Sequence, residues 1–291
     1  MDANHREEDC TALALDTSSS VLAAAITRNG RTVDASHSFT ERNHSVRVVS
    51  DLQDLMKKNG LTRAKVDVIA VGQGPGSYTG VRIAVSAAKT LAWAWNKPLV
   101  GVSSLEATAF SAWTKLEPRH AAAAGAAVSD AAGDAPASAG TVADAGAAVW
   151  IVPLMDARRG QAYTSLFTAG RNGEWASVEK DGIRLVADWV RQLRERYEQL
   201  EASERPSAVY LVGELAFLEG KKGPALDLEA LSAGWPLRLE PSVIDAGAVG
   251  VLAERRFRLG VQEDIHGFAP NYTQLTEAEV NLIKAGTESR I

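Results

Sequence analysis

Hydrophobic residues in the first part of the chain alternate between short β-branched runs and stretches with helical spacing. Apolar runs at 11–16, 21–27 and 31–39 predict three strands, and Asn29-Gly30 predicts a hairpin turn between the second and the third. A helix capped by Asn43 or Ser45 is predicted to end near residue 59. Its apolar positions recur at helical spacing: Val46, Val49, Leu52, Leu55 and Met56.

A glycine-rich turn, Gly72 to Arg82, joins the next predicted strand (66–71) to a helix that reaches Trp95. Gly74 and Gly76 can adopt backbone angles that other residues rarely reach, and Ser77 or Thr79 can cap the helix. Free N–H groups at a helix start favour an anion, so the turn is a candidate ligand site. An ordinary connection is the alternative, because the sequence lacks both the P-loop ending and the dinucleotide spacing.

The helix after this turn carries small side chains on one face: Gly80, Ala84, Ala87 and Ala88. Small residues allow another helix or a sheet to approach closely. Two interpretations stay open, namely packing on the chain's own sheet and docking of a partner.

The hydrophobic pattern of the opening repeats in the second half of the chain. A strand at 149–155 ends at Asp156-Ala157-Arg158-Arg159-Gly160, and a strand at 162–168 follows; helices are expected at 185–200 and 246–259. Three antiparallel strands followed by a helix open the actin-like, ribonuclease-H-like fold. The repeat predicts an α/β fold of two lobes, the duplicated actin-like architecture of the acetate kinase, sugar kinase and heat-shock ATPase superfamily.

The predicted division of the chain follows its composition. Residues 1–10 are expected to form a disordered tail, 11–117 the N-terminal lobe, 118–148 an Ala-rich flexible insert, and 149–291 a C-terminal lobe with a closing helix. The insert has too few large apolar side chains to offset its ordering entropy.

Two polar turns would face the cleft between the lobes. ATPases of this fold hold phosphate at the turn after the first strand and usually have a glycine there, whereas this chain has Thr17 and Ser18. Asp16 either takes part in a degenerate phosphate loop or caps the turn. Asp156 and Arg158 either contact a ligand or form a surface ion pair. The candidate cleft residues are Asp16, Thr17, Ser18, Gly74, Gly76, Ser77, Asp156 and Arg158.

Charge and residue content exclude several classes of protein. The net charge of −5 argues against a chain that holds nucleic acid alone, and the single cysteine, Cys10, excludes an intrachain disulfide. No histidine lies four residues from another, and no serine has His and Asp at a recognised spacing, so neither a metal site nor a catalytic set is expected. No apolar run reaches about 20 residues, and the start is acidic, so we expect a cytoplasmic protein without a membrane span or signal peptide.

Five motifs resemble the bacterial TsaB (YeaZ-like) family, in that family's order. They are LALDTSSS (13–20), GPGSYTGVRIAVSAAKTLAW (74–93), KPLVGVSSLEA (97–107), VPLMDARRGQAY (152–163) and PNYTQLTEAE (270–279). The resemblance implies a non-catalytic dimerization subunit of the complex that makes threonylcarbamoyladenosine on tRNA. Its partner TsaD would carry the metal and transfer the threonylcarbamoyl group from its adenylate, and the ATPase TsaE would join them.

The resemblance further implies no cofactor on this chain and contact with tRNA only within the complex. It places the TsaD interface on the helices near 43–59 and 78–95. The residues expected there are Val48, Asp51, Leu52, Leu55, Tyr78, Gly80, Arg82, Ala84, Ala87, Ala88 and Leu91. An independent ATP-dependent kinase is the alternative function, and a glycoprotease-like peptidase is a weaker one. A homodimer through the same helices when the partner is absent is a third possibility, because an apolar helical face rarely stays exposed.

Overall fold

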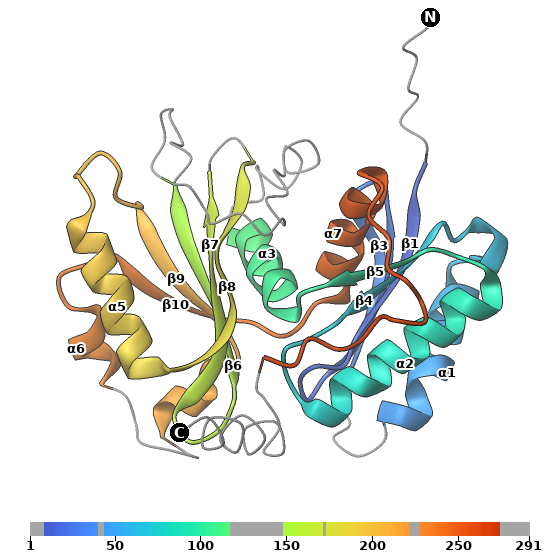
Figure 1. Ribbon diagram of the computed structural model, residues 1–291, viewed down its shortest axis with the longest axis horizontal. Coiled ribbons are helices and arrows are strands. Elements are labelled where there is room, and N and C mark those ends of the chain that lie inside the picture. The colour runs from blue at the N-terminus through green and yellow to red at the C-terminus, as the bar shows by residue number, and fades with distance from the viewer. Residues whose placement is uncertain (1–8, 40–43, 117–147, 171–172, 221–226, 274–291) are drawn as a thin grey trace, which may run out of the picture.

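The computed structural model describes residues 9–39, 44–116, 148–170, 173–220 and 227–273. Within these residues, ten strands form two five-stranded sheets, one in each half of the chain (Figure 1). Helices cover the outer face of each sheet, and two further helices lie between the sheets. The predicted two-lobe arrangement is therefore confirmed.

The first sheet has the order β3-β2-β1-β4-β5. Strands β1 and β2 pair antiparallel, as do β2 and β3, whereas β4 runs parallel to β1 and to β5. The elements of this lobe are β1 (Thr11–Asp16), β2 (Leu22–Arg28), β3 (Arg31–Ser38), α1 (His44–Lys58), η1 (Arg63–Lys65), β4 (Val68–Gly72), α2 (Tyr78–Trp95), β5 (Leu99–Val102) and α3 (Ser104–Leu116). The predicted strands and helices agree with β1 to β4, α1 and α2 within a few residues of their bounds.

The second sheet repeats this topology with the order β10-β9-β6-β7-β8. Its first three strands again pair antiparallel, and β9 runs parallel to β6 and to β10. Its elements are β6 (Val149–Asp156), β7 (Gln161–Ala169), β8 (Trp175–Leu185), α5 (Val186–Gln199), β9 (Ala208–Gly213), η2 (Leu215–Glu219), α6 (Leu228–Ser232), β10 (Leu237–Pro241) and α7 (Ala246–Arg258). The repeated order confirms the duplicated actin-like fold.

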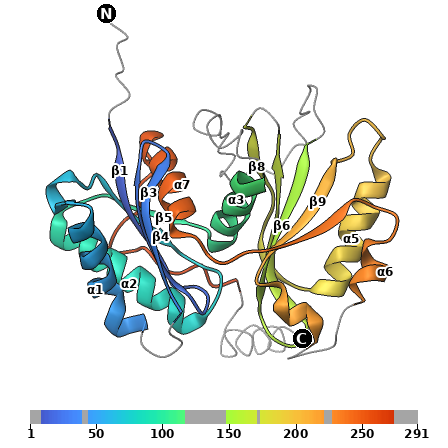
Figure 2. The ribbon, with the colours of Figure 1, turned by 180° about the vertical axis from the view of Figure 1, so that it is seen from behind.

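Helices α1 and α2 cover the outer face of the first sheet (Figure 2). Their buried side chains, among them Leu52, Leu55 and Val85, pack against Leu13, Ile26 and other residues of the strands. On the second sheet, α5 plays the same part with Trp189 and Leu193. Each sheet therefore has a core of its own on its outer face.

A third core joins the two lobes. Helix α7 packs on the inner face of the first sheet, and α3 packs on β6, β7 and β9 of the second. Glycines in α7 permit this approach, since a Cβ on Gly250 would lie 2.6 Å from the side chain of Thr27. Each lobe therefore contributes its last helix to the layer between the sheets.

The packing of α7 on the first sheet and of α3 on the second corrects the predicted boundaries of the lobes. The C-terminal lobe does not extend through 149–291 without interruption, because α7 and the residues after it contact the first sheet. The predicted tail of 1–10 also ends too late: Cys10 is buried, and its carbonyl accepts the backbone N–H of Asn29. The Ala-rich insert and most of the predicted closing helix lie outside the described residues.

Candidate functional site

A groove between α1 and α2 opens on the outer face of the first lobe. Its volume is about 640 Å³, and most of its lining is apolar. Tyr78 is 54% exposed and Val49 is 44% exposed, although both are large hydrophobic side chains. A contiguous exposed apolar patch or groove often marks a site where another protein binds, so this groove is a candidate interface.

The groove contains five of the residues that the sequence placed at an interface: Val48, Tyr78, Arg82, Ala87 and Leu91. Five further lining residues were missed: Val49, Thr79, Ile83, Ser86 and Thr90. A helical period of three to four residues, counted from Tyr78 and Arg82 along α2, would have identified those on that helix.

The other predicted interface residues lie elsewhere. The side chains of Leu52 and Leu55 and those of Ala84 and Ala88 are buried in the core beneath the two helices. Asp51 accepts a hydrogen bond from Ser38 on β3, at 2.9 Å. These residues hold α1 and α2 on their own sheet, which is the packing interpretation of the small-residue face.

Gly80 also belongs to this packing and not to the groove. A Cβ at this position would lie 1.9 Å from the backbone oxygen of Thr17, so no other residue fits without movement of the main chain. The Oγ1 of Thr17 donates a hydrogen bond of 2.6 Å to the carbonyl of Gly80. The first turn of α2 is therefore fixed directly on the loop after β1.

An aromatic and cationic cluster marks the N-terminal end of the groove. The Tyr78 and Tyr272 rings are stacked, with their centroids 5.4 Å apart. Nη1 of Arg82 donates to the hydroxyl of Tyr78 at 2.8 Å, and the guanidinium lies over the same ring. Tyr272 is 46% exposed and was not among the predicted interface residues.

The turn after β1 is closed and buried. Asp16 is fully buried; its Oδ1 accepts the backbone N–H of Ser18 at 2.7 Å, and its Oδ2 accepts the hydroxyl of Ser104 at 2.7 Å. Burial raises the pKa of Asp16, and the hydrogen bonds from Ser104 and Ser18 oppose that shift. Asp16 therefore makes the capping contact that one of the two interpretations predicted.

The glycine-rich turn is bonded to the turn after β1. The backbone N–H of Ser77 donates to the carbonyl of Ser18 at 2.6 Å, and the N–H of Gly80 donates to the hydroxyl of Ser77. Gly76 has a φ of +157°, and a Cβ there would lie 2.3 Å from the Ser18 carbonyl oxygen. Amide groups that could meet a phosphate are thus used within the protein.

The second lobe has the matching turn between β6 and β7. The backbone N–H of Arg158 donates to Oδ1 of Asp156 at 2.8 Å, which repeats the contact between Ser18 and Asp16. The side chain of Arg158 is exposed, and the residue has a φ of +72°. Met155 also lies beside Gly76, since a Cβ on that glycine would come within 2.9 Å of its sulfur. The glycine-rich turn of the first lobe therefore lies beside the end of β6 in the second lobe.

Across the described part of the chain, no three His, Cys, Asp or Glu side chains gather in a way that could hold a metal ion. Over the same residues, no helix has both the length and the apolar character needed to cross a bilayer.

The chain is similar to known proteins in its sequence and in its fold. The family model of TsaD, tRNA N6-adenosine threonylcarbamoyltransferase, matches residues 37–130. The TsaB protein of Bacillus subtilis, named for tRNA threonylcarbamoyladenosine biosynthesis, is 30% identical over 94% of this chain and 99% of its own length. The Escherichia coli TsaB is 28% identical over 62% of this chain and 66% of its own.

Among solved structures, a Pseudomonas aeruginosa protein described as similar to the peptidase YEAZ superposes with a TM-score of 0.61 at 21% identity. The match covers 91% of this chain and 100% of that one, and it supports the fold. Sequence identity over nearly the full length of a curated relative identifies the family. The chain belongs to the TsaB family of tRNA threonylcarbamoyladenosine biosynthesis proteins.

Proposed function

We propose that this chain is a non-catalytic partner subunit that binds TsaD through the groove between α1 and α2. It would hold TsaD in the arrangement that transfers the threonylcarbamoyl group to the anticodon-adjacent adenosine of tRNA. The observation that carries the proposal is the groove itself, with Tyr78 and Val49 exposed to solvent. Apolar and aromatic side chains in this setting are typical of a protein interface.

The match to the TsaD family model indicates which surface of the partner would take part. The matched residues, 37–130, include both α1 and α2. A TsaD protein therefore has sequence counterparts of the two helices that form the groove. Two similar helix pairs can pack together about an approximate twofold axis, as they do when one surface patch serves both subunits. The same geometry would allow two copies of this chain to pair when TsaD is absent.

The buried turns support a role without catalysis on this chain. Ser18 and Ser77 use their backbone N–H groups inside the protein, and both oxygens of Asp16 accept hydrogen bonds from protein groups. We therefore place the metal and the nucleotide or adenylate in the partner subunits TsaD and TsaE. The net charge of −5 agrees with contact to tRNA only within the complex. The expected compartment is the cytoplasm.

The first experiment tests whether the chain binds TsaD and whether tRNA modification requires the chain. The purified chain is mixed with TsaD of the same organism, and tRNA modification is measured with both proteins and with TsaD alone. Co-purification at one to one, with modification that requires both, is the expected result. Failure to associate, together with ATP hydrolysis by this chain alone, would overturn the proposal in favour of an actin-like kinase.

A pair of variants tests the groove. Ala87 lines it and is half-buried, so Ala87→Arg places a charged side chain where the partner would pack. Ala187→Arg makes the same change at a half-buried helical alanine on α5, in the other lobe. We expect Ala87→Arg to abolish co-purification and Ala187→Arg to leave it intact, with both proteins folded by circular dichroism. Equal binding by the two variants would show that TsaD uses another surface.

A further inference from the structure

The residues after α7 connect the second lobe with the groove. This C-terminal segment (residues 259–273) leaves α7 and runs back beside α2 toward the space between the lobes (Figure 1). It is attached to the first lobe along its way. The N–H of Glu263 donates to the carbonyl of Leu99 at 2.8 Å, Phe268 is buried, and Nζ of Lys89 donates to the carbonyl of Phe268 at 2.7 Å.

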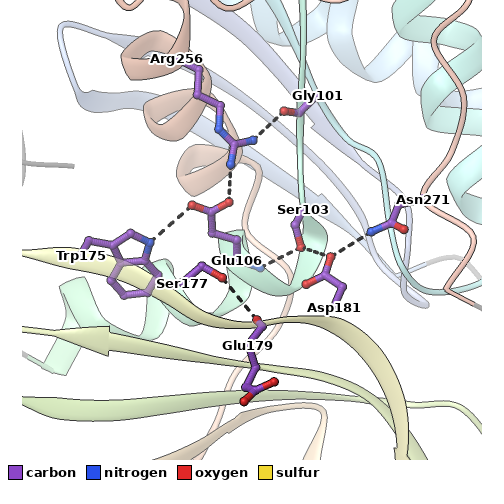
Figure 3. Close-up of polar contacts among 9 residues, drawn as sticks. All are labelled: Gly101, Ser103, Glu106, Trp175, Ser177, Glu179, Asp181, Arg256 and Asn271. Atoms are coloured by element: carbon purple, nitrogen blue, oxygen red, sulfur yellow. Dashed lines mark hydrogen bonds and ion pairs between the residues drawn. The ribbon is translucent and has the colours of Figure 1, made fainter. Parts of the chain in front are cut away.

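The segment reaches the junction of the lobes at Asn271. Its backbone N–H donates to the carbonyl of Gln73 at 2.7 Å, in the glycine-rich turn. Its side-chain Nδ2 donates to Oδ2 of Asp181 at 2.9 Å, and the hydroxyl of Ser103 donates to the same oxygen at 2.7 Å (Figure 3). Because Asp181 lies on β8, Asn271 joins the C-terminal segment to the second lobe.

The next residue, Tyr272, reaches the rim of the groove. Its ring is stacked on that of Tyr78, which lines the groove, and about half of each side chain is exposed. Two partly exposed aromatic rings and Arg82 therefore form one continuous surface at the N-terminal end of α2. Tyrosine and arginine are the residue types that most often dominate binding energy at interfaces.

We propose that Tyr272 is a further contact residue of the TsaD-binding surface, positioned there by the hydrogen bond between Asn271 and Asp181 of the other lobe. The inference rests on the proposed function, since it names additional residues of the same interface. It extends the interface beyond the two helices and gives the second lobe a means of controlling it. Asn271 and Asp181 are positioning residues, because they act on the partner through Tyr272.

If Tyr272 had a purely structural role, its truncation would lower the stability of the fold and leave the affinity for TsaD unchanged. The segment is already held by Phe268, by Lys89 and by the backbone bond between Asn271 and Gln73. Tyr272 itself is half exposed, so its truncation removes little buried area. Its loss should therefore change binding to the partner far more than it changes folding.

Titration calorimetry with purified TsaD measures this directly on the full chain. Truncating an aromatic contact at an interface typically weakens binding by about tenfold, and we expect that loss for Tyr272→Ala. Tyr272→Phe keeps the ring and should bind as the wild type does. Leu239→Ala removes an exposed apolar side chain on β10 of the other lobe and serves as the control. If Tyr272→Ala melts early, Tyr272→Leu supplies a second test of the ring.

A double-mutant cycle tests the positioning step. Asn271→Ala should weaken binding in the wild-type background and have almost no further effect in the Tyr272→Ala background. Additive effects of the two changes would show that Asn271 does not act through Tyr272.

The failures of the two proposals can be told apart. Wild-type binding that Ala87→Arg abolishes and Tyr272→Ala leaves unchanged overturns this inference alone. A wild-type chain that does not bind TsaD at all overturns the proposed function, and the inference with it.

Discussion

Asp181→Asn should remove a pH dependence of stability that arises at the junction between the lobes. The carboxylate lies between β8 and the turn before α3, and burial raises its pKa to about 6 from an ordinary value of 3.8. The charge of Glu106 adds to this shift, whereas Arg256 and the hydrogen bonds from Ser103 and Asn271 oppose it. Asparagine keeps the shape and a hydrogen-bond acceptor but cannot ionise.

The sign of the effect follows from where the proton binds. The folded protein binds a proton at Asp181 between pH 3.8 and about 6, where the unfolded chain has largely lost it. Acidification through this window therefore stabilises the fold, and the benefit is lost as the pH rises above about 6. One pKa unit corresponds to about 1.4 kcal/mol, so the full difference is about 3 kcal/mol.

Urea unfolding of the wild type and of Asp181→Asn at closely spaced pH values from 4 to 8 measures this difference. Other carboxylates titrate in the same range, but they do so in both proteins and cancel when the two free energies are subtracted. The expected result is a wild type that gains up to about 3 kcal/mol relative to the variant as the pH falls from 7 to 4. Parallel stability curves would show that the Asp181 carboxyl has an ordinary pKa in the fold.

Two further substitutions and one labelling experiment test packing elsewhere in the protein. Arg256→Ala should cost about 3 kcal/mol of unfolding free energy in urea, because Glu106 would lose its ion-pair partner in the buried layer between the lobes; a loss below 1 kcal/mol would refute this. The Cys10 thiol is buried, and burial raises its pKa to about 12, so reaction with a thiol reagent at pH 8 should proceed only as fast as unfolding; rapid labelling of the native protein would contradict it. Gly80→Ala should lower the melting temperature by several degrees, since the new methyl group would overlap the Thr17 carbonyl, and an unchanged melting curve would count against this packing.

Hydrophobic spacing and the family resemblance together predicted the two-lobe α/β architecture. The three opening strands follow short apolar runs, the helices α1 and α2 have apolar residues at a period of about 3.6, and the repeat after residue 149 indicated the duplication. The edge strands β8 and β10 were missed. Each lies at an edge of its sheet, and most of its residues are exposed or half-buried. Neither sequence therefore has the apolar run that identifies a central strand.

The exchange of helices between the lobes could not be predicted from sequence. The helix at 246–259 was predicted correctly as a helix, but its sequence did not indicate what it packs against. In the structure, Arg255 lies against the ring of Phe110, and Arg256 bonds to Glu106 of α3. A helical pattern shows which residues are buried, but it does not show which sheet buries them.

The small-residue face of α2 packs against the chain's own first lobe, which its sequence could not distinguish from a docking face. Gly80, Ala84 and Ala88 were assigned to the partner because small residues permit close approach, and they do permit it, but toward the chain's own sheet. The groove is lined by the neighbouring face of α2, which carries Ala87 and Leu91. The resemblance to a family pointed to this pair of helices, and only the three-dimensional packing separated the face buried on the sheet from the face that lines the groove.

The polar groups of the turn after β1 help to fix the position of the groove on the outer face of the first lobe. ATPases of this fold use the corresponding turn to hold phosphate, whereas here Thr17 donates to the Gly80 carbonyl and Ser18 accepts the N–H of Ser77. Both bonds fix the first turn of α2, and that turn carries Tyr78. The buried turn therefore sets the position of the aromatic residue at the rim of the groove. On this chain, the hydrogen bonds of the turn after β1 therefore help to position the groove that we propose as the TsaD-binding surface.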